Sequence, residues 1–159
     1  MTFLAASDSA QQTKDYGAAL APCLQPGDVV LLYGDLGAGK TQFAQGVARG
    51  LGVDDEVTSP TFNILLEYEG RLPLYHFDLY RLTEPDQLED IDFYAVVEGD
   101  GASLIEWGDR FPDEMPEDRL EVSLTVDENE QRELSVLATG PRSAALLSAW
   151  KQAQEDGAQ

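Results

Sequence analysis

The stretch Gly34-Asp35-Leu36-Gly37-Ala38-Gly39-Lys40-Thr41 fits the phosphate-loop pattern, Gly and four residues before Gly-Lys-Thr, at every required position. The apolar run 29–33 before it is rich in β-branched and aromatic residues, which predicts a buried parallel strand. After the loop, apolar side chains recur every fourth residue at Phe43, Val47 and Leu51, which predicts a helix. A strand, a glycine-rich loop and a helix in this order predict a site for a nucleoside triphosphate.

The residue types of this loop explain how it would hold phosphate. Glycines at 34, 37 and 39 permit backbone conformations closed to other residues, so successive N–H groups can point at one anion. The N-terminus of the following helix adds its positive dipole end. We expect Lys40 to reach the β- and γ-phosphates and the Thr41 hydroxyl to bind Mg²⁺. The remaining loop residues, Asp35, Leu36 and Ala38, are expected to line the nucleotide as well.

The composition of the chain limits both its location and its partners. Its 159 residues suit one domain, residues 1–159, with a frayed tail expected over 154–159. Thirty acidic and ten basic residues give a net charge of −20, whereas direct nucleic-acid binding takes clustered Lys and Arg. The acidic surface instead favours a basic protein partner or solubility in high salt. A single cysteine, no signal peptide and no membrane-spanning run predict a cytoplasmic protein without membrane contact.

Hydrophobic alternation and turn residues predict the other elements of the chain. Residues 62–69 pair with 72–80 in one hairpin, and 119–126 with 133–138 in another. A strand over 2–6 precedes the first helix, and a buried strand covers 102–107. Gly46, inside the helix after the phosphate loop, is expected to permit close packing on the sheet. The expected N-caps are Ser7 or Ser9 for the first helix, Thr83 for an acidic helix, and Ser143 for the last helix.

Two acids end apolar strands and are candidates for a metal beside the phosphate loop. Asp78 follows the run 74–77, and Glu106 follows Leu104 and Ile105. An acid at the end of a buried strand is costly unless it is paired or binds a metal. Mg²⁺ at a phosphate loop takes such a carboxylate directly or through water. One acid would serve the metal and the other would orient water or couple a switch loop, and residue type alone does not rank them.

Other side chains have a functional and a structural interpretation. The hydroxyl of Thr61, with those at 58 and 59, is placed for a switch loop near Mg²⁺, or for a polar loop capped by its own hydroxyls. His76, the only histidine, is expected to be satisfied and partly buried rather than catalytic. Arg81 would reach a phosphate or a partner's carboxylate, or form a structural salt bridge. Trp107 is expected in the core, with a base-stacking face or an interface with a partner as alternatives.

These pieces together resemble one known family. The phosphate loop, Ser59-Pro60-Thr61, His76-Phe77-Asp78-Leu79-Tyr80-Arg81 and Ile105-Glu106-Trp107 in this order resemble the bacterial TsaE family. Members of that family are the ATPases of tRNA threonylcarbamoyladenosine biosynthesis. Many families share the phosphate loop, so the His-Phe-Asp-Leu-Tyr-Arg and Glu-Trp pieces are the specific part. The resemblance covers the chain from about Ser9 to the final hairpin.

The resemblance implies a fold, partners and residue roles. The fold would be a three-layer α/β, P-loop NTPase-like fold with a mixed central sheet flanked by helices. ATP use would reset the complex of TsaB and TsaD, which transfers threonylcarbamoyl to the adenosine beside the anticodon, and tRNA would be contacted only indirectly. The implied roles are Mg²⁺ binding for Thr41 and Glu106, hydrolysis for Asp78, switching for Thr61, and an adenine pocket near Gln11, Thr13 and Arg132.

Three other functions compete with this one. A small-molecule kinase would need an arginine-rich lid, and the seven arginines of this chain are scattered. A GTPase would need Asn-Lys-x-Asp, and neither Asn63 nor Asn129 is followed by lysine. A nucleotide-dependent binding module with negligible turnover stays open, because no arginine finger is evident in the chain. We therefore expect slow intrinsic hydrolysis that a partner accelerates.

Overall fold

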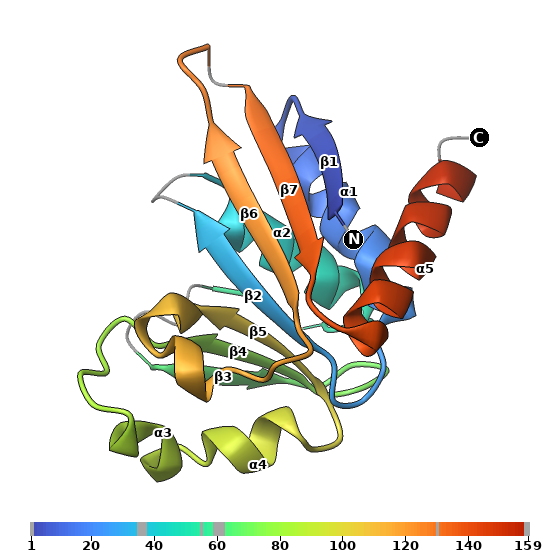
Figure 1. Ribbon diagram of the computed structural model, residues 1–159. Helices are drawn as coiled ribbons and strands as arrows, with labels where there is room; N and C mark the ends of the chain where they lie inside the picture. The colour runs from blue at the N-terminus through green and yellow to red at the C-terminus, as the bar shows by residue number, and fades with distance from the viewer. Residues whose placement is uncertain (1, 35–37, 55, 59–62, 130, 158–159) are drawn as a thin grey trace.

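The computed structural model describes residues 2–34, 38–54, 56–58, 63–129 and 131–157, and a seven-stranded mixed sheet forms its centre (Figure 1). Across the sheet lie β1 (Thr2–Ser7), β7 (Arg132–Ala138), β6 (Leu120–Val126), β2 (Val29–Gly34), β5 (Ala102–Glu106), β4 (Leu74–Asp78) and β3 (Leu65–Tyr68), in this order. The central strands β6, β2, β5 and β4 run parallel. The pairs β1–β7, β6–β7 and β3–β4 are antiparallel, so both predicted hairpins are confirmed.

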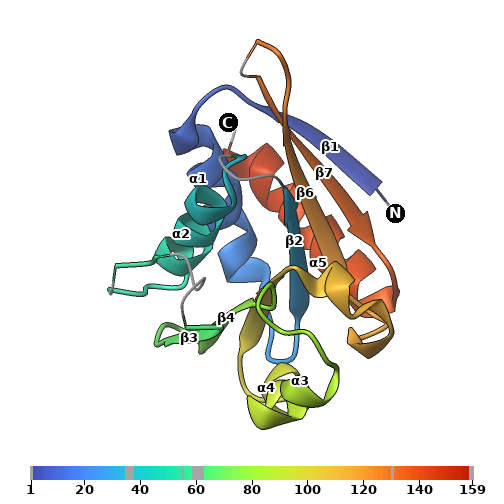
Figure 2. The ribbon, with the colours of Figure 1, turned by 90° about the vertical axis from the view of Figure 1, so that its left-hand side faces the viewer.

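Helices cover both faces of this sheet. On one face lie α1 (Ala10–Leu20), α2 (Lys40–Gly50) and α5 (Pro141–Gly157), around a core that includes Phe43, Leu147 and Trp150 (Figures 1 and 2). On the other lie α3 (Asp86–Asp90) and α4 (Phe93–Val97), around Phe77 and Phe93. Single 3-10 turns follow α1 at Ala21–Cys23 and β5 at Gly108–Arg110 and Pro112–Glu114. The expected three-layer α/β fold with a mixed sheet is confirmed.

Two serines near the start of α1 have different roles. Ser9 is the N-cap, because its hydroxyl accepts the backbone N–H of Gln12 at 3.1 Å. The Ser7 hydroxyl lies 2.6 Å from the Thr13 hydroxyl instead. The last residue of β1 is thereby tied to the first turn of α1, and this contact fixes where the Thr13 side chain lies.

Two of the predicted helix caps are wrong. Thr83 does not cap α3, because the Gln87 amide oxygen accepts the Thr83 N–H at 2.7 Å and closes this turn from within the helix. Ser143 lies inside the first turn of α5. The carboxylate of Asp118, from the chain before β6, accepts the N–H groups of Arg142 and Ser143 at 2.8 and 2.9 Å. A cap from so distant a residue leaves no local sequence signal.

Helices α1 and α2 lie side by side (Figure 2), and a glycine lets their backbones come into contact. A Cβ atom on Gly46 would lie 1.9 Å from the carbonyl oxygen of Lys14 in α1, so no side chain fits there. Gly46 thus packs against α1, and the expected packing against the sheet is wrong. The close contact holds α1, which carries Thr13, beside α2, which begins at Lys40.

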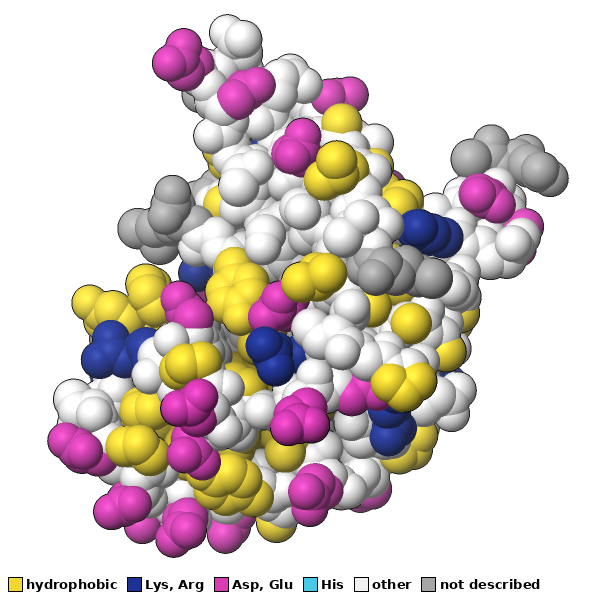
Figure 3. Space-filling view, in the orientation of Figure 1, with side chains coloured by type: hydrophobic (Ala, Val, Ile, Leu, Met, Phe, Trp, Pro, Cys, Tyr) yellow, Lys and Arg dark blue, Asp and Glu magenta, His cyan; other side chains and the backbone are white. Residues whose placement is uncertain are grey.

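Acidic side chains dominate the lower part of the face that Figure 3 shows, over α3 and α4. Glu84, Asp86, Glu89 and Asp90 are all exposed in this segment. The net charge of −20 is therefore carried in part by a layer that covers only one side of the sheet. Within the described ranges, no helix has both the length and the hydrophobicity that crossing a membrane requires.

Candidate functional site

The described ends of the phosphate loop lie at the carboxyl ends of the parallel strands. Strand β2 ends at Gly34 and α2 begins at Lys40. Gly39, which precedes α2, has a φ of 112°, in the left-handed region that favours glycine. Lys40 and Thr41 occupy the first turn of α2, where backbone N–H groups have no partner within the helix. The predicted contacts of residues 35–37 (Asp35, Leu36 and Gly37) lie outside the described residues.

Both candidate acids reach this edge of the sheet, because β5 lies between β2 and β4. Glu106 pairs in register with Leu32 of β2 and with Asp78 of β4. Its Oε1 atom is 3.4 Å from Lys40 Nζ, and its Oε2 atom is 2.8 Å from His76 Nε2. The Glu106 side chain is 8% exposed and that of His76 is 1% exposed. The structure thus joins the loop lysine, an acid and the only histidine in one buried group.

Glu106 is ionised despite its burial. Burial acts to raise the pKa of Glu106, but the hydrogen bond from His76 and the positive charge of Lys40 outweigh it, and the pKa lies below its usual value. A charged carboxylate at the end of a central strand, next to the first turn of α2, is the kind of oxygen ligand that Mg²⁺ binds.

Asp78 is also buried but has different contacts. Its carboxylate accepts the Tyr80 N–H at 3.0 Å, and its own N–H donates to the carbonyl of Ile64 at 2.7 Å. Ile64 has a φ of 65°, which is uncommon for a β-branched residue. It follows shortly after Thr61, which lies outside the described residues. Asp78 is therefore tied to the chain that leaves the predicted switch segment, whereas Glu106 is the acid that contacts Lys40.

Trp107 is exposed at the rim of the site, so the expectation that it lies in the core is wrong. Its backbone has a φ of 64°, which turns the chain immediately after Glu106, and 38% of the residue is exposed. Its ring centroid lies 4.9 Å from that of Tyr80 and 5.5 Å from Lys40 Nζ. Arg81 lies in the exposed turn that follows β4. Trp107 thus lies between Tyr80 and the loop lysine on the outer rim.

Two of the three residues predicted for the adenine pocket lie beside the end of the phosphate loop. A Cβ atom built on Gly39 would lie 3.4 Å from Thr13 Cγ2 and 3.9 Å from Arg132 Cδ. Arg132 Nε is buried and has no hydrogen-bond partner among the described residues. Gln11 is exposed, and its amide donates to Asp15 one turn further along α1 at 2.9 Å. Thr13 and Arg132 therefore lie beside Gly39, whereas the Gln11 side chain is hydrogen-bonded to Asp15.

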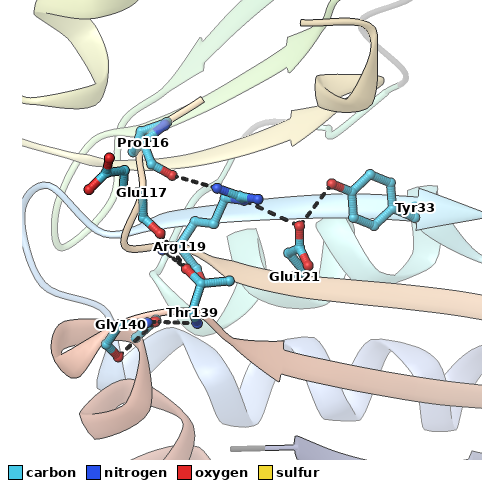
Figure 4. A network of polar contacts seen from close by, with 8 residues as sticks. Tyr33, Pro116, Glu117, Arg119, Glu121, Thr139 and Gly140 are labelled. Carbon is cyan, nitrogen blue, oxygen red and sulfur yellow. Dashed lines mark hydrogen bonds and ion pairs between the residues drawn. The ribbon is translucent and has the colours of Figure 1, made fainter. Parts of the chain in front are cut away.

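A cavity of about 350 Å³ adjoins the loop and is lined by Tyr33, Gly34, Lys40, Trp107, Asp109 and Ser123, among others. The hydroxyl of Tyr33 donates to Glu121 at 3.2 Å, and Glu121 also accepts from Arg119 Nε (Figure 4). Burial and the neighbouring Glu121 charge raise the pKa of Tyr33 to about 12, so the phenol stays protonated. Tyr33 in the cavity wall is thereby hydrogen-bonded to Glu121 of β6.

The residues present fit a metal that arrives with a nucleotide. Across the described ranges, no three His, Cys, Asp or Glu side chains converge to hold a metal ion by themselves. Mg²⁺ keeps several waters and is often shared between one or two carboxylates and substrate phosphates. Glu106 and the Thr41 hydroxyl supply that incomplete set, and the unpaired Arg132 Nε supplies a donor on the side of Thr13.

His76 is the member of this group whose role the sequence does not reveal. The expectation of a satisfied, partly buried histidine is right only in part. The ring is fully buried, its Nε2 atom contacts the candidate metal ligand Glu106, and its Nδ1 atom has no hydrogen-bond partner among the described residues. Period-two alternation does place His76 on the same face of β4 as Asp78. Its contact with Glu106 depends on the register between β4 and β5, which the sequence does not show.

Comparison with known proteins gives consistent matches. Residues 7–134 match the family model described as threonylcarbamoyl adenosine biosynthesis protein TsaE. A protein of that name from Treponema pallidum is 46% identical over 130 residues, covering 82% of this chain and 96% of the relative. One from Bacillus subtilis is 41% identical over 137 residues, covering 86% and 85%. The crystal structure of Bacillus subtilis YdiB matches with a TM-score of 0.82 at 33% identity, covering 96% of this chain and 95% of that one.

Proposed function

Because this chain belongs to the TsaE family, which serves tRNA threonylcarbamoyladenosine biosynthesis, we propose that it is an ATPase that binds Mg²⁺-ATP at the phosphate loop. One observation carries the proposal. Glu106 contacts Lys40 at 3.4 Å beside the first turn of α2, and this juxtaposition of acid, lysine and helix N-terminus suits a phosphate-bound metal.

Each residue has a distinct task in this proposal. Lys40 and the N–H groups of the first turn of α2 bind the phosphates, and Thr41 and Glu106 hold the metal. Mg²⁺, when bound, neutralises charge on the transferred phosphoryl group. Asp78 orients water or couples the switch segment, and its pairing in register with Glu106 supports a role at this edge of the sheet. Thr13 and Arg132 bind the nucleoside, which their place beside Gly39 supports.

The activity is proposed to act through protein partners. TsaB and TsaD are the expected partners, and ATP turnover would reset their complex, while tRNA is contacted only indirectly. The net charge of −20 supports this arrangement, since it opposes a direct grip on tRNA and favours a basic protein surface. Intrinsic hydrolysis is expected to be slow and to rise when the partners bind, in the cytoplasm where the tRNA is modified.

A comparison of two lysine variants tests the nucleotide site. Lys40→Ala is expected to weaken ATP binding by about 10²-fold or more, because it removes a charged donor to phosphate. Lys151→Ala is the matched control, since Lys151 lies on α5 and donates to the Thr2 carbonyl. Binding is measured by calorimetry, and hydrolysis is measured with and without TsaB and TsaD. ATP affinity that Lys40→Ala leaves unchanged would refute the phosphate-loop assignment, and binding without turnover would favour the nucleotide-dependent binding module.

A further inference from the structure

The buried imidazole of His76 has one polar partner among the residues that the structure describes. Its Nε2 atom lies 2.8 Å from Glu106 Oε2, and its Nδ1 atom is buried with no partner among the described residues. Since an ionised carboxylate only accepts, Nε2 must carry a proton and donate to Glu106. Among the described residues, no polar atom bonds the Nδ1 side of the ring. The contact with Glu106 is thus the polar interaction that gives this histidine its place.

The two oxygens of Glu106 are therefore not equivalent. Oε2 accepts the hydrogen bond from His76 Nε2. Oε1 lies 3.4 Å from the Lys40 ammonium, on the side of the phosphate loop. A carboxylate free to rotate could offer both oxygens to one ion. With Oε2 tied to a fully buried ring, Glu106 has one oxygen left for the nucleotide site.

Packing alone does not require a histidine at this position. The neighbouring inward positions of the same face, Leu74 and Leu104, are apolar and fully buried. An imidazole with one unpartnered nitrogen is more costly to bury than a leucine of similar size. A functional demand on Glu106 accounts for this cost, because groups that orient metal ligands commonly hydrogen-bond to them in the same way.

We propose that His76 is a positioning residue that restricts Glu106 to one metal-facing oxygen and thereby favours Mg²⁺ over Ca²⁺. The physical basis is coordination geometry. Mg²⁺ requires a near-ideal octahedron, which one carboxylate oxygen and several waters supply, whereas Ca²⁺ takes more oxygens and accepts both from one carboxylate. The inference rests on the proposed function, since it assumes that Glu106 serves a nucleotide-bound metal.

The experiment measures ATP affinity by calorimetry with either MgCl₂ or CaCl₂ in His76 variants. His76→Phe removes the donor and keeps a buried ring. We expect it to lose about tenfold or more in Mg²⁺-supported affinity and less with Ca²⁺, so that the ratio of the two affinities falls. His76→Gln, whose amide N–H reaches the place of Nε2, is expected to retain the ratio. His76→Asn, which is shorter by one carbon than the glutamine variant, is expected to lose the wild-type ratio. If the phenylalanine variant does not fold, the comparison of His76→Gln with His76→Asn tests the positioning role.

A neighbouring substitution separates positioning from loss of stability. Phe77→Leu changes a fully buried residue of the same strand that packs against Phe93 on the other face of the sheet. It should lower the melting temperature and leave the ratio of the Mg²⁺- and Ca²⁺-supported affinities unchanged. An unchanged ratio in His76→Phe or His76→Asn, or equal losses with both ions, would overturn the positioning role. A wild-type protein whose ATP affinity needs no divalent ion would instead overturn the proposed function on which it rests.

Discussion

Replacing Gly46 with alanine is expected to destabilise the protein although alanine is the better helix former. In an isolated helix the change would stabilise by about 1 kcal/mol. Here the new Cβ atom would meet the Lys14 carbonyl oxygen at 1.9 Å, and a backbone atom cannot rotate away. Helix α1 must therefore shift by roughly 1 Å, and overpacking of this kind costs about 3 kcal/mol. The net loss is about 2 kcal/mol, or about 4–8 °C in Tm for a chain of this length.

Thermal and urea unfolding measure this loss, and Gly52→Ala serves as the control. Gly52 has a φ of 80°, but a Cβ atom there would meet nothing within 4 Å, so the expected cost of about 1 kcal/mol is purely conformational. Because α1 carries Thr13, Gly46→Ala should also weaken ATP binding, whereas Gly52→Ala should not. A Gly46→Ala variant at least as stable as the wild type would refute the close contact between α1 and α2.

The remaining predictions concern charge. Glu106→Gln should weaken Mg²⁺-dependent ATP binding more than Asp78→Asn does, and calorimetry showing the reverse order would exchange the two roles. The pKa of Glu106 is lowered in the folded state, so its contribution to stability is full above the unfolded value of about 4.5 and is lost as pH falls through the folded pKa. Between about pH 6 and pH 3, the free energy of unfolding measured in urea should therefore fall more for the wild type than for Glu106→Gln. An equal fall in the two proteins would contradict the ionised state of Glu106. Raising NaCl from about 50 to 500 mM should weaken association with TsaB and TsaD, whereas salt-insensitive association would indicate an apolar interface.

Features that depend on neighbouring residues could be predicted from the sequence. The phosphate loop occupies eight consecutive residues with a strand before it and a helix after it, and both hairpins are contained in short segments. Asp78 and Glu106 are recognisable as candidate acids because each ends an apolar run. These signals are local, so period and turn chemistry are enough to read them.

Features that depend on register or on distant contacts could not be predicted. The sequence does not place Glu106 between His76 and Lys40, since that requires the pairing of β5 with both β2 and β4. It does not show that Asp118 caps α5. Trp107 is exposed and has a left-handed backbone conformation. The sequence does not predict this conformation, because it is uncommon for bulky aromatic residues.

The pairing of β1 with β7 sets the order in which this site is completed during synthesis. Residues 2–7 leave the ribosome long before their strand partner, residues 132–138, is made. Closing so long a loop carries an entropic cost that only the finished sheet repays. Ser7 in that strand holds the Thr13 hydroxyl, and Arg132 comes from β7 itself. In the nascent chain, the phosphate loop is therefore made well before Arg132, which completes the side of the site proposed to bind the nucleoside.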